Sequence, residues 1–126
     1  MSTAQLFDTV ANRDVLGFAD NYKKIAAFLD LDYNDLSKMA QIRRQKVRLD
    51  DPIPSEISER LREIAIIANL VAEFFEGDAN RTAAWFHANN PSLGNVKPRD
   101  MLRLGRFHKL HQFVREAREE AGWGHA

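Results

Sequence analysis

The chain has 126 residues, which is enough for one compact core and too few for two ordinary domains. Its 44% hydrophobic and 29% charged residues are typical of a folded globular protein and exclude a disordered chain. A formal net charge of zero excludes a global attraction to nucleic acid, and the lack of cysteine excludes disulfides, thiolate metal sites and cysteine nucleophiles.

The sequence shows neither an export signal at its N-terminus nor a membrane-spanning run. The N-terminus lacks a basic and then apolar signal sequence, and no apolar run approaches the roughly 20 residues that cross a bilayer. We therefore expect a cytoplasmic protein that has no contact with a membrane.

Helical patterns follow one another through the first fifty residues. The predicted helices cover residues 3–11, 20–31, 33–40 and 43–49. Ser2 and Gln5 have the spacing of a capping box before the first of them. Asp32 is placed to cap the third, and Gln41 offers a tight connection into the fourth.

Two prolines in residues 50–55 interrupt this series, and because proline inside a helix costs about 3 kcal/mol, we expect a linker there. Further helices are predicted over residues 55–75, over 80–89 with Asp78 placed to start it, from Pro98 onward, and over 107–121. The first of these is apolar on nearly every face, so its own chain or a second copy is expected to bury it. The sequence therefore predicts an all-α protein, with lobes over residues 1–50 and 55–126 joined by the long apolar helix.

The segment from Asp35 to Leu49 matches the pattern of a helix-turn-helix. Apolar side chains fall where that motif locks its two helices together, and its second helix presents a polar, basic face. Arginine and glutamine can pair with base edges in the major groove, and lysine neutralises phosphates. The candidate DNA-binding residues are Lys38, Arg43, Arg44, Gln45, Lys46 and Arg48. Gln41 and Asp50 depart from the motif, and the solvated face of a basic helix is the alternative interpretation.

A second motif lies between Trp85 and Leu102. It runs W…NPxLG…PxxML, through the segments NPSLG at residues 90–94 and PRDML at 98–102. With the long helix and the helix-turn-helix before it, this pattern resembles the Xre/MbcA/ParS antitoxin toxin-binding domain over about residues 20 to 121. Asn95, where a second glycine is common, and the final residues 119–126 depart from the family pattern.

The resemblance implies a type II antitoxin that blocks the active site of a RES-domain, NAD-consuming toxin. It also implies a homodimer that binds its own operator DNA through its N-terminal half. The candidate toxin-binding residues are Trp85, Asn90, Pro91, Leu93, Gly94, Pro98, Met101, Leu102, Arg115, Arg118, Trp123 and His125.

The physical features of these residues leave alternatives open. The Asn-Pro and Leu-Gly pairs form a rigid turn, which suits packing as well as binding, and Trp85 suits a core as well as an interface. Trp123 has no evident core to enter, which predicts that the last helix and residues 122–126 reach the toxin, with a frayed terminus as the alternative. A basic zone over residues 97–109 could meet DNA, an acidic toxin surface or water.

No catalytic pattern stands out. His108 and His111 lie three residues apart, but no carboxylate completes a metal site, and the scattered glycines form no phosphate loop. We therefore expect no enzyme, metal or cofactor. Two other functions stay open: a stand-alone helix-turn-helix transcriptional regulator, and an interaction adaptor without DNA binding.

Overall fold

The computed structural model describes residues 13–122. Its elements are α2 (Tyr22–Phe28), α3 (Tyr33–Ala40), η1 (Arg44–Lys46), α4 (Ser55–Phe74), α5 (Ala79–His87), η2 (Pro91–Leu93), α6 (Pro98–Arg103) and α7 (Phe107–Glu120). In this range the regular structure is helical, with one isolated β-bridge between Asn90 and Val96, which confirms the all-α prediction there. The helix predicted over residues 3–11, and Trp123 and His125, lie outside the described residues.

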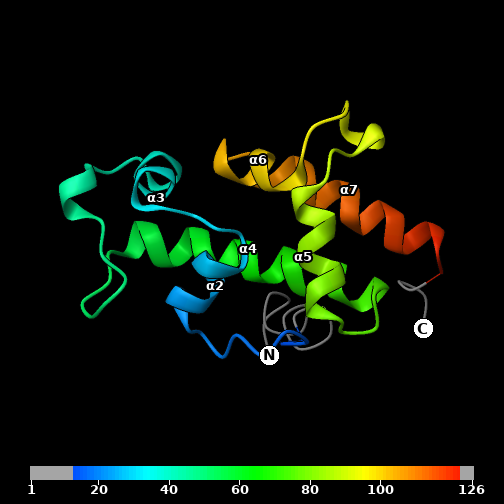
Figure 1. The fold of residues 1–126 in the computed structure, drawn as a ribbon, viewed down its shortest axis with the longest axis horizontal. Coiled ribbons are helices and arrows are strands. Elements are labelled where there is room, and N and C mark those ends of the chain that lie inside the picture. The colour runs from blue at the N-terminus through cyan, green and yellow to red at the C-terminus, as the bar shows by residue number, and fades with distance from the viewer. Residues whose placement is uncertain (1–12, 123–126) are drawn as a thin grey trace, which may run out of the picture.

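Helix α4 runs along the long axis of the molecule, and the other helices are arranged around it (Figure 1). It contacts α2, α3, α5 and α7, and its apolar side chains Ile57, Leu61, Ile64, Ile67 and Leu70 are almost fully buried. One cluster of buried residues continues from Phe18 to Val114. The chain's own helices therefore account for most of the apolar character of α4. None of the helices within residues 13–122 combines the length and the apolar run that a bilayer crossing requires.

One polar residue in the second half of α4 forms hydrogen bonds with the first residues that the structure describes. Asn69 is 7% exposed, and its Oδ1 accepts a hydrogen bond from the Leu16 N–H at 2.8 Å. Its side-chain amide donates to Asp14 at 3.4 Å, and the same carboxylate accepts from the N–H groups of Phe18 and Ala19. A buried amide is stable only with such partners, so Asn69 positions the turn that leads into α2.

The boundaries of α2 and α3 follow from their caps. The Asn21 side chain accepts from the Lys24 N–H at the start of α2. Asp32 caps α3, as the sequence predicts, and Asp35 completes a capping box by accepting from the Asp32 N–H at 3.0 Å. These bonds satisfy backbone donors that the first turn of a helix leaves free.

Residues 43–49 differ from the sequence prediction. The predicted second helix of the helix-turn-helix is corrected to the single 3-10 turn η1, because the backbone is extended on both sides of it, at Arg43 and Val47. Val47 is 6% exposed, so the extended segment serves to bring its side chain into the core. A seven-residue helix crowded with like charges has little stability of its own to oppose this.

Candidate partner-binding site

Helix α5 leads into the motif that carries the resemblance. Asp78 caps it as predicted, accepting from the Arg81 N–H at 3.1 Å. Phe86 is fully buried, while Trp85 is half-buried, packs against the core and meets Phe86 edge-on with ring centroids 5.0 Å apart. Trp85 therefore contributes to packing and still presents part of its ring at the surface.

The loop after α5 is closed by Asn90. Its N–H donates to the Val96 carbonyl at 3.0 Å, and its own carbonyl accepts from the N–H of Asn95 at 2.9 Å and of Leu93 at 3.0 Å. Its side chain accepts from the Ser92 N–H at 2.9 Å. Residues 90–96, which we term the Asn90 loop, are therefore held at both ends.

The tip of the Asn90 loop faces solvent. Pro91, Ser92, Gly94 and Asn95 are exposed, whereas Leu93 and Val96 pack against the core from inside the loop. Figure 1 shows the loop projecting beyond α5 and α6. Gly94 and Asn95 have φ of 76° and 64°, and because asparagine tolerates the left-handed region, it can stand where the family pattern has glycine.

Helix α6 buries the next part of the motif. Pro98 occupies its first turn, as predicted, and is buried. Met101 is 3% exposed and Leu102 is fully buried, so both serve the core and offer no surface to a partner. This corrects the assignment of Pro98, Met101 and Leu102 to toxin contact. A helix of six residues can join this core only by burying one face, and these are the side chains on that face.

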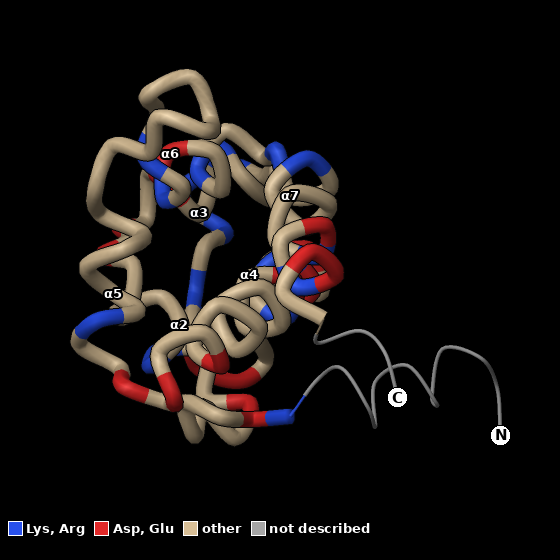
Figure 2. Tube along the Cα trace, turned by 90° about the vertical axis from the view of Figure 1, so that its right-hand side faces the viewer, with Lys and Arg blue, Asp and Glu red and all other residues tan. Residues whose placement is uncertain are grey.

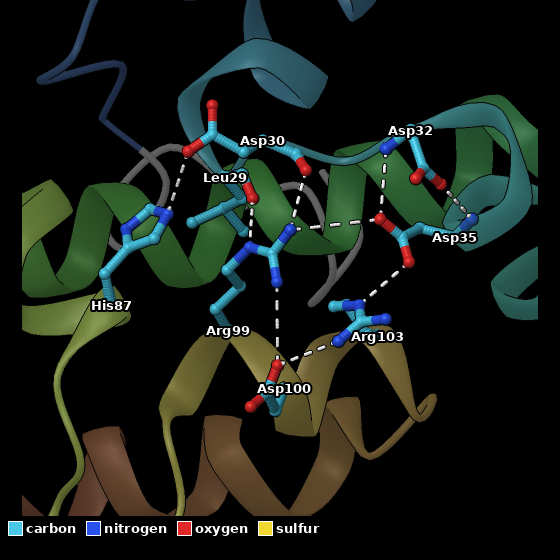
Figure 3. A network of polar contacts seen from close by, with 8 residues as sticks. All are labelled: Leu29, Asp30, Asp32, Asp35, His87, Arg99, Asp100 and Arg103. Carbon is cyan, nitrogen blue, oxygen red and sulfur yellow. Dashed lines mark hydrogen bonds and ion pairs between the residues drawn. The ribbon is translucent and has the colours of Figure 1, made fainter.

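A polar network fastens the opposite face of α6 to the N-terminal half (Figure 3). The Arg103 guanidinium donates to Asp35 at 2.8 Å and to Asp100 at 3.1 Å. The Arg99 guanidinium donates to the carbonyls of Leu29 and Asp30 and lies 3.9 Å from Asp35. Asp35 of α3 thus accepts from its own helix start and from α6, which fixes α6 against the turn between α2 and α3.

The titration of Asp35 follows from these partners. Burial by itself raises the pKa of its carboxyl group, but the hydrogen bonds from the Asp32 N–H and Arg103, with the charges of Arg103 and Arg99, lower the pKa below its usual range. Such a group contributes stability above its unfolded pKa, about 3.9, and this contribution is lost as the pH falls through the lower folded pKa.

We therefore expect the free energy of unfolding to decline with acid partly through Asp35. The stability difference between wild type and Asp35→Asn, measured by urea titration, should be largest near neutral pH and shrink at about pH 3, below the unfolded pKa. A difference that stays constant over this range would show that the Asp35 charge contributes nothing.

His87 extends the network to α5. Its Nδ1 lies 2.8 Å from the Ala83 carbonyl, which can only accept, so Nδ1 carries the proton. Its Nε2 lies 3.2 Å from an Asp30 carboxylate oxygen (Figure 3). The chain segments on both sides of the Asn90 loop, α5 and α6, therefore meet the same turn after α2.

The candidate residues on α7 separate into two environments. Arg118 forms an ion pair with Glu73 of α4, and both side chains are largely buried, at 17% and 19% exposed. The Arg118 side chain therefore serves an ion pair within the chain, which corrects its assignment to toxin contact. Arg115 is exposed, and Trp123 and His125 lie outside the described residues.

All the candidate DNA-binding residues reach the surface: Lys38, Arg43, Arg44, Gln45, Lys46 and Arg48 are exposed. The Arg48 guanidinium is held in place, since it donates to the carbonyls of Asp50 at 3.0 Å and Asp51 at 2.8 Å. Lys38 lies in the last turn of α3, and the other five lie on or beside η1, so these five form a cationic loop and not the outward face of a recognition helix.

The basic residues of the zone over 97–109 also fall into two groups, one engaged in the Asp35 network and one exposed. Arg99 and Arg103 are engaged in the Asp35 network, whereas Lys97, Arg106 and Lys109 are exposed and form no ion pair within residues 13–122. Among the same residues, no three histidine or acidic side chains gather as a metal site would require.

Comparison of the chain with models of protein families, with curated proteins and with solved structures gave no match. The fold and the site define a small helical protein of one continuous core, with a closed exposed loop and a cationic surface. Sequence patterns did not predict the Asp35 network. The capping pair Asp32 and Asp35 was its one local signal, because the Arg103 partner lies 68 residues away.

Proposed function

We propose that this chain is the antitoxin of a type II toxin–antitoxin system and that it binds and neutralises a RES-family, NAD-consuming toxin by blocking its active site. The observation that carries the proposal is the Asn90 loop. Hydrogen bonds of Asn90 close this loop, and its tip is exposed. The loop leads into helix α6, which the Asp35 network holds against the N-terminal half. It coincides with the W…NPxLG…PxxML motif, whose resemblance to the antitoxin domain supports the same function.

A closed loop suits this task for an energetic reason. Fixing the backbone of one flexible residue costs about 1–2 kcal/mol, and a loop already held by its own hydrogen bonds avoids much of that cost on binding. The exposed loop residues Pro91, Ser92, Gly94 and Asn95, with the exposed part of Trp85, are the surface that a toxin could contact. The buried residues of the motif pack α6 against the core and so fix the position of the loop.

Co-expression with a RES-family protein encoded beside this chain tests the proposal. We expect the toxin alone to arrest growth and deplete cellular NAD, and the pair to grow with normal NAD. Growth arrest that persists although the chain is present, soluble and folded would refute the antitoxin function.

The C-terminal tail is proposed to enter the toxin site together with the exposed end of α7 near Arg115. Deleting residues 122–126 should weaken neutralisation at least about tenfold, because a single buried tryptophan anchor such as Trp123 is commonly worth about 2 kcal/mol or more. The concentration of chain needed to halve toxin activity measures this. Neutralisation equal to that of the full chain would exclude the tail from toxin binding.

Operator DNA binding is a second proposal, favoured by the exposed cations around η1. Because these lie on a 3-10 turn, phosphate contacts should dominate over base reading. Replacing Arg43, Arg44 and Lys46 with alanine should flatten the slope of log Kd against log salt by up to about 0.9 for each phosphate that the variant no longer neutralises. Binding assays on promoter DNA at several salt concentrations measure the slope. If the wild-type chain does not bind its promoter DNA, an interaction adaptor without DNA binding is the better function.

We also propose that the chain acts as a cytoplasmic homodimer. Ile66 and Ala65 on α4 are only half-buried in the single chain, which leaves apolar surface for a second copy. Analytical ultracentrifugation over a wide concentration range tests this, and a monomer at every concentration would contradict it. If the dimer forms and binds DNA but no toxin is bound, the stand-alone regulator is the better function.

A further inference from the structure

Leu104 stands out on the surface of the molecule. Its side chain is 66% exposed, and within residues 13–122 the other exposed large hydrophobic residue is Tyr33, at 43%. A single exposed leucine is common in proteins, so its exposure alone needs no explanation. What distinguishes Leu104 from an ordinary exposed leucine is the rigid backbone around it and the cationic residues that follow it.

The backbone around Leu104 is fixed. Leu104 is the C-terminal cap of α6, Gly105 follows with φ of 77°, and its N–H donates to the Leu102 carbonyl at 3.0 Å. The Arg106 N–H donates to the Met101 carbonyl at 2.9 Å, which completes a Schellman motif. Because Met101 and Leu102 are core residues, this corner presents Leu104 from a rigid support.

The surroundings of Leu104 are cationic. Arg106 and Lys109 follow it within five residues, both exposed and without an ion pair among the described residues. Asp100, the one acid between residues 97 and 111, is occupied by Arg99 and Arg103. Figure 2 shows Lys and Arg gathered around α6 and the beginning of α7, with most Asp and Glu elsewhere. Residues 97–111 therefore carry a local excess of positive charge next to an exposed apolar side chain, although the whole chain is neutral.

We propose that the corner formed by Leu104, Arg106 and Lys109 is a docking surface for an acidic protein segment that carries an apolar side chain. The segment would place that side chain against Leu104 and its carboxylates beside Arg106 and Lys109. This inference rests on the proposed function, because it names the chemistry of the toxin surface that the antitoxin contacts.

A protein fits this corner better than a nucleic acid does. Phosphate backbones are met by cationic and hydrogen-bonding side chains, and a protruding leucine gains nothing from them. In a protein contact, by contrast, an apolar anchor within a charged rim is the usual arrangement, and the charges mainly choose the partner and speed its approach.

Nuclear magnetic resonance of the full ¹⁵N-labelled chain tests the proposal without the toxin. The probes are a synthetic peptide with one leucine among glutamates, the same peptide with glutamines in place of glutamates, and a short DNA duplex. We expect the glutamate peptide to shift the amide signals of residues 104–109 saturably, and the glutamine peptide to bind more weakly.

Two variants complete the test. Leu104→Ser should weaken peptide binding about tenfold, the loss expected for one partly buried leucine, and should leave the melting temperature unchanged. Tyr33→Ser is the matched control and should bind as wild type does.

Equal binding of both peptides, shifts confined to other residues, or duplex binding at this corner without peptide binding would each overturn the docking surface. Failure of the antitoxin function is a separate result, since it appears in the co-expression assay, in which Leu104 is unchanged.

Discussion

Replacing Asp35 with alanine is expected to lower the free energy of unfolding by about 3 kcal/mol, at the low end of the cost of breaking a buried ion pair. The Asp35 side chain is 8% exposed and accepts from the Asp32 N–H and the Arg103 guanidinium. The low end applies because Arg103 is itself 39% exposed, so water partly solvates it once Asp35 is gone. Urea titration at neutral pH measures the loss.

Asp32→Ala is the matched control for this experiment. It removes the hydrogen bond from the Asp35 N–H to the Asp32 side chain and leaves the Asp35 contacts with α6 intact. The expected cost is about 1 kcal/mol, typical of a helix N-cap. If both variants lost the same stability, Asp35 would be only a capping residue, and the fastening of α6 to the N-terminal half would be wrong.

Opening the Asn90 loop is expected to weaken toxin binding at least about 100-fold. The change replaces residues 90–96 with glycines and serines of equal number, which removes the Asn90 side-chain hydrogen bond, the contacts of Leu93 and Val96 with the core, and the exposed Pro91 and Asn95. A freed loop must be ordered again on binding, at about 1–2 kcal/mol for each residue, and about 2.7 kcal/mol already corresponds to 100-fold. Titration calorimetry with the purified toxin measures the change.

Asn89→Ala is the control for the loop. Asn89 is exposed and stands beside Asn90, but the hydrogen bonds that close the loop come from Asn90 and Val96. Its replacement should therefore leave binding unchanged. Unaltered affinity in the opened-loop variant, with the helices still folded by circular dichroism, would move the toxin contact away from this loop.

Local sequence patterns predicted the helices with strong caps. Asp32 and Asp78 begin α3 and α5 as expected, and Pro98 opens α6, because capping and proline geometry depend on neighbouring residues alone. The helix expected over residues 43–49 failed for a tertiary reason. Burial of Val47 holds the chain extended beside η1, and a short basic helix has too little stability of its own to form instead.

The candidate site was predictable in position but not in which side chains face outward. The spacing of NPSLG indicated a rigid turn, and the structure has one. Met101 and Leu102 are equally part of the motif, yet they are buried, and Arg118 pairs with Glu73, 45 residues away along the chain. Only packing decides these environments, so the resemblance of the motif could not separate its core side chains from its exposed ones.

Neutralisation of an NAD-consuming toxin by direct binding is the proposed function of this chain. It is tested most directly by following NAD consumption by the purified RES-family protein encoded beside it while the chain is added in increasing amounts. We expect NAD consumption to fall in proportion to added chain and to stop at a fixed ratio of the two proteins. Consumption that continues unchanged in a large excess of folded chain would contradict direct neutralisation.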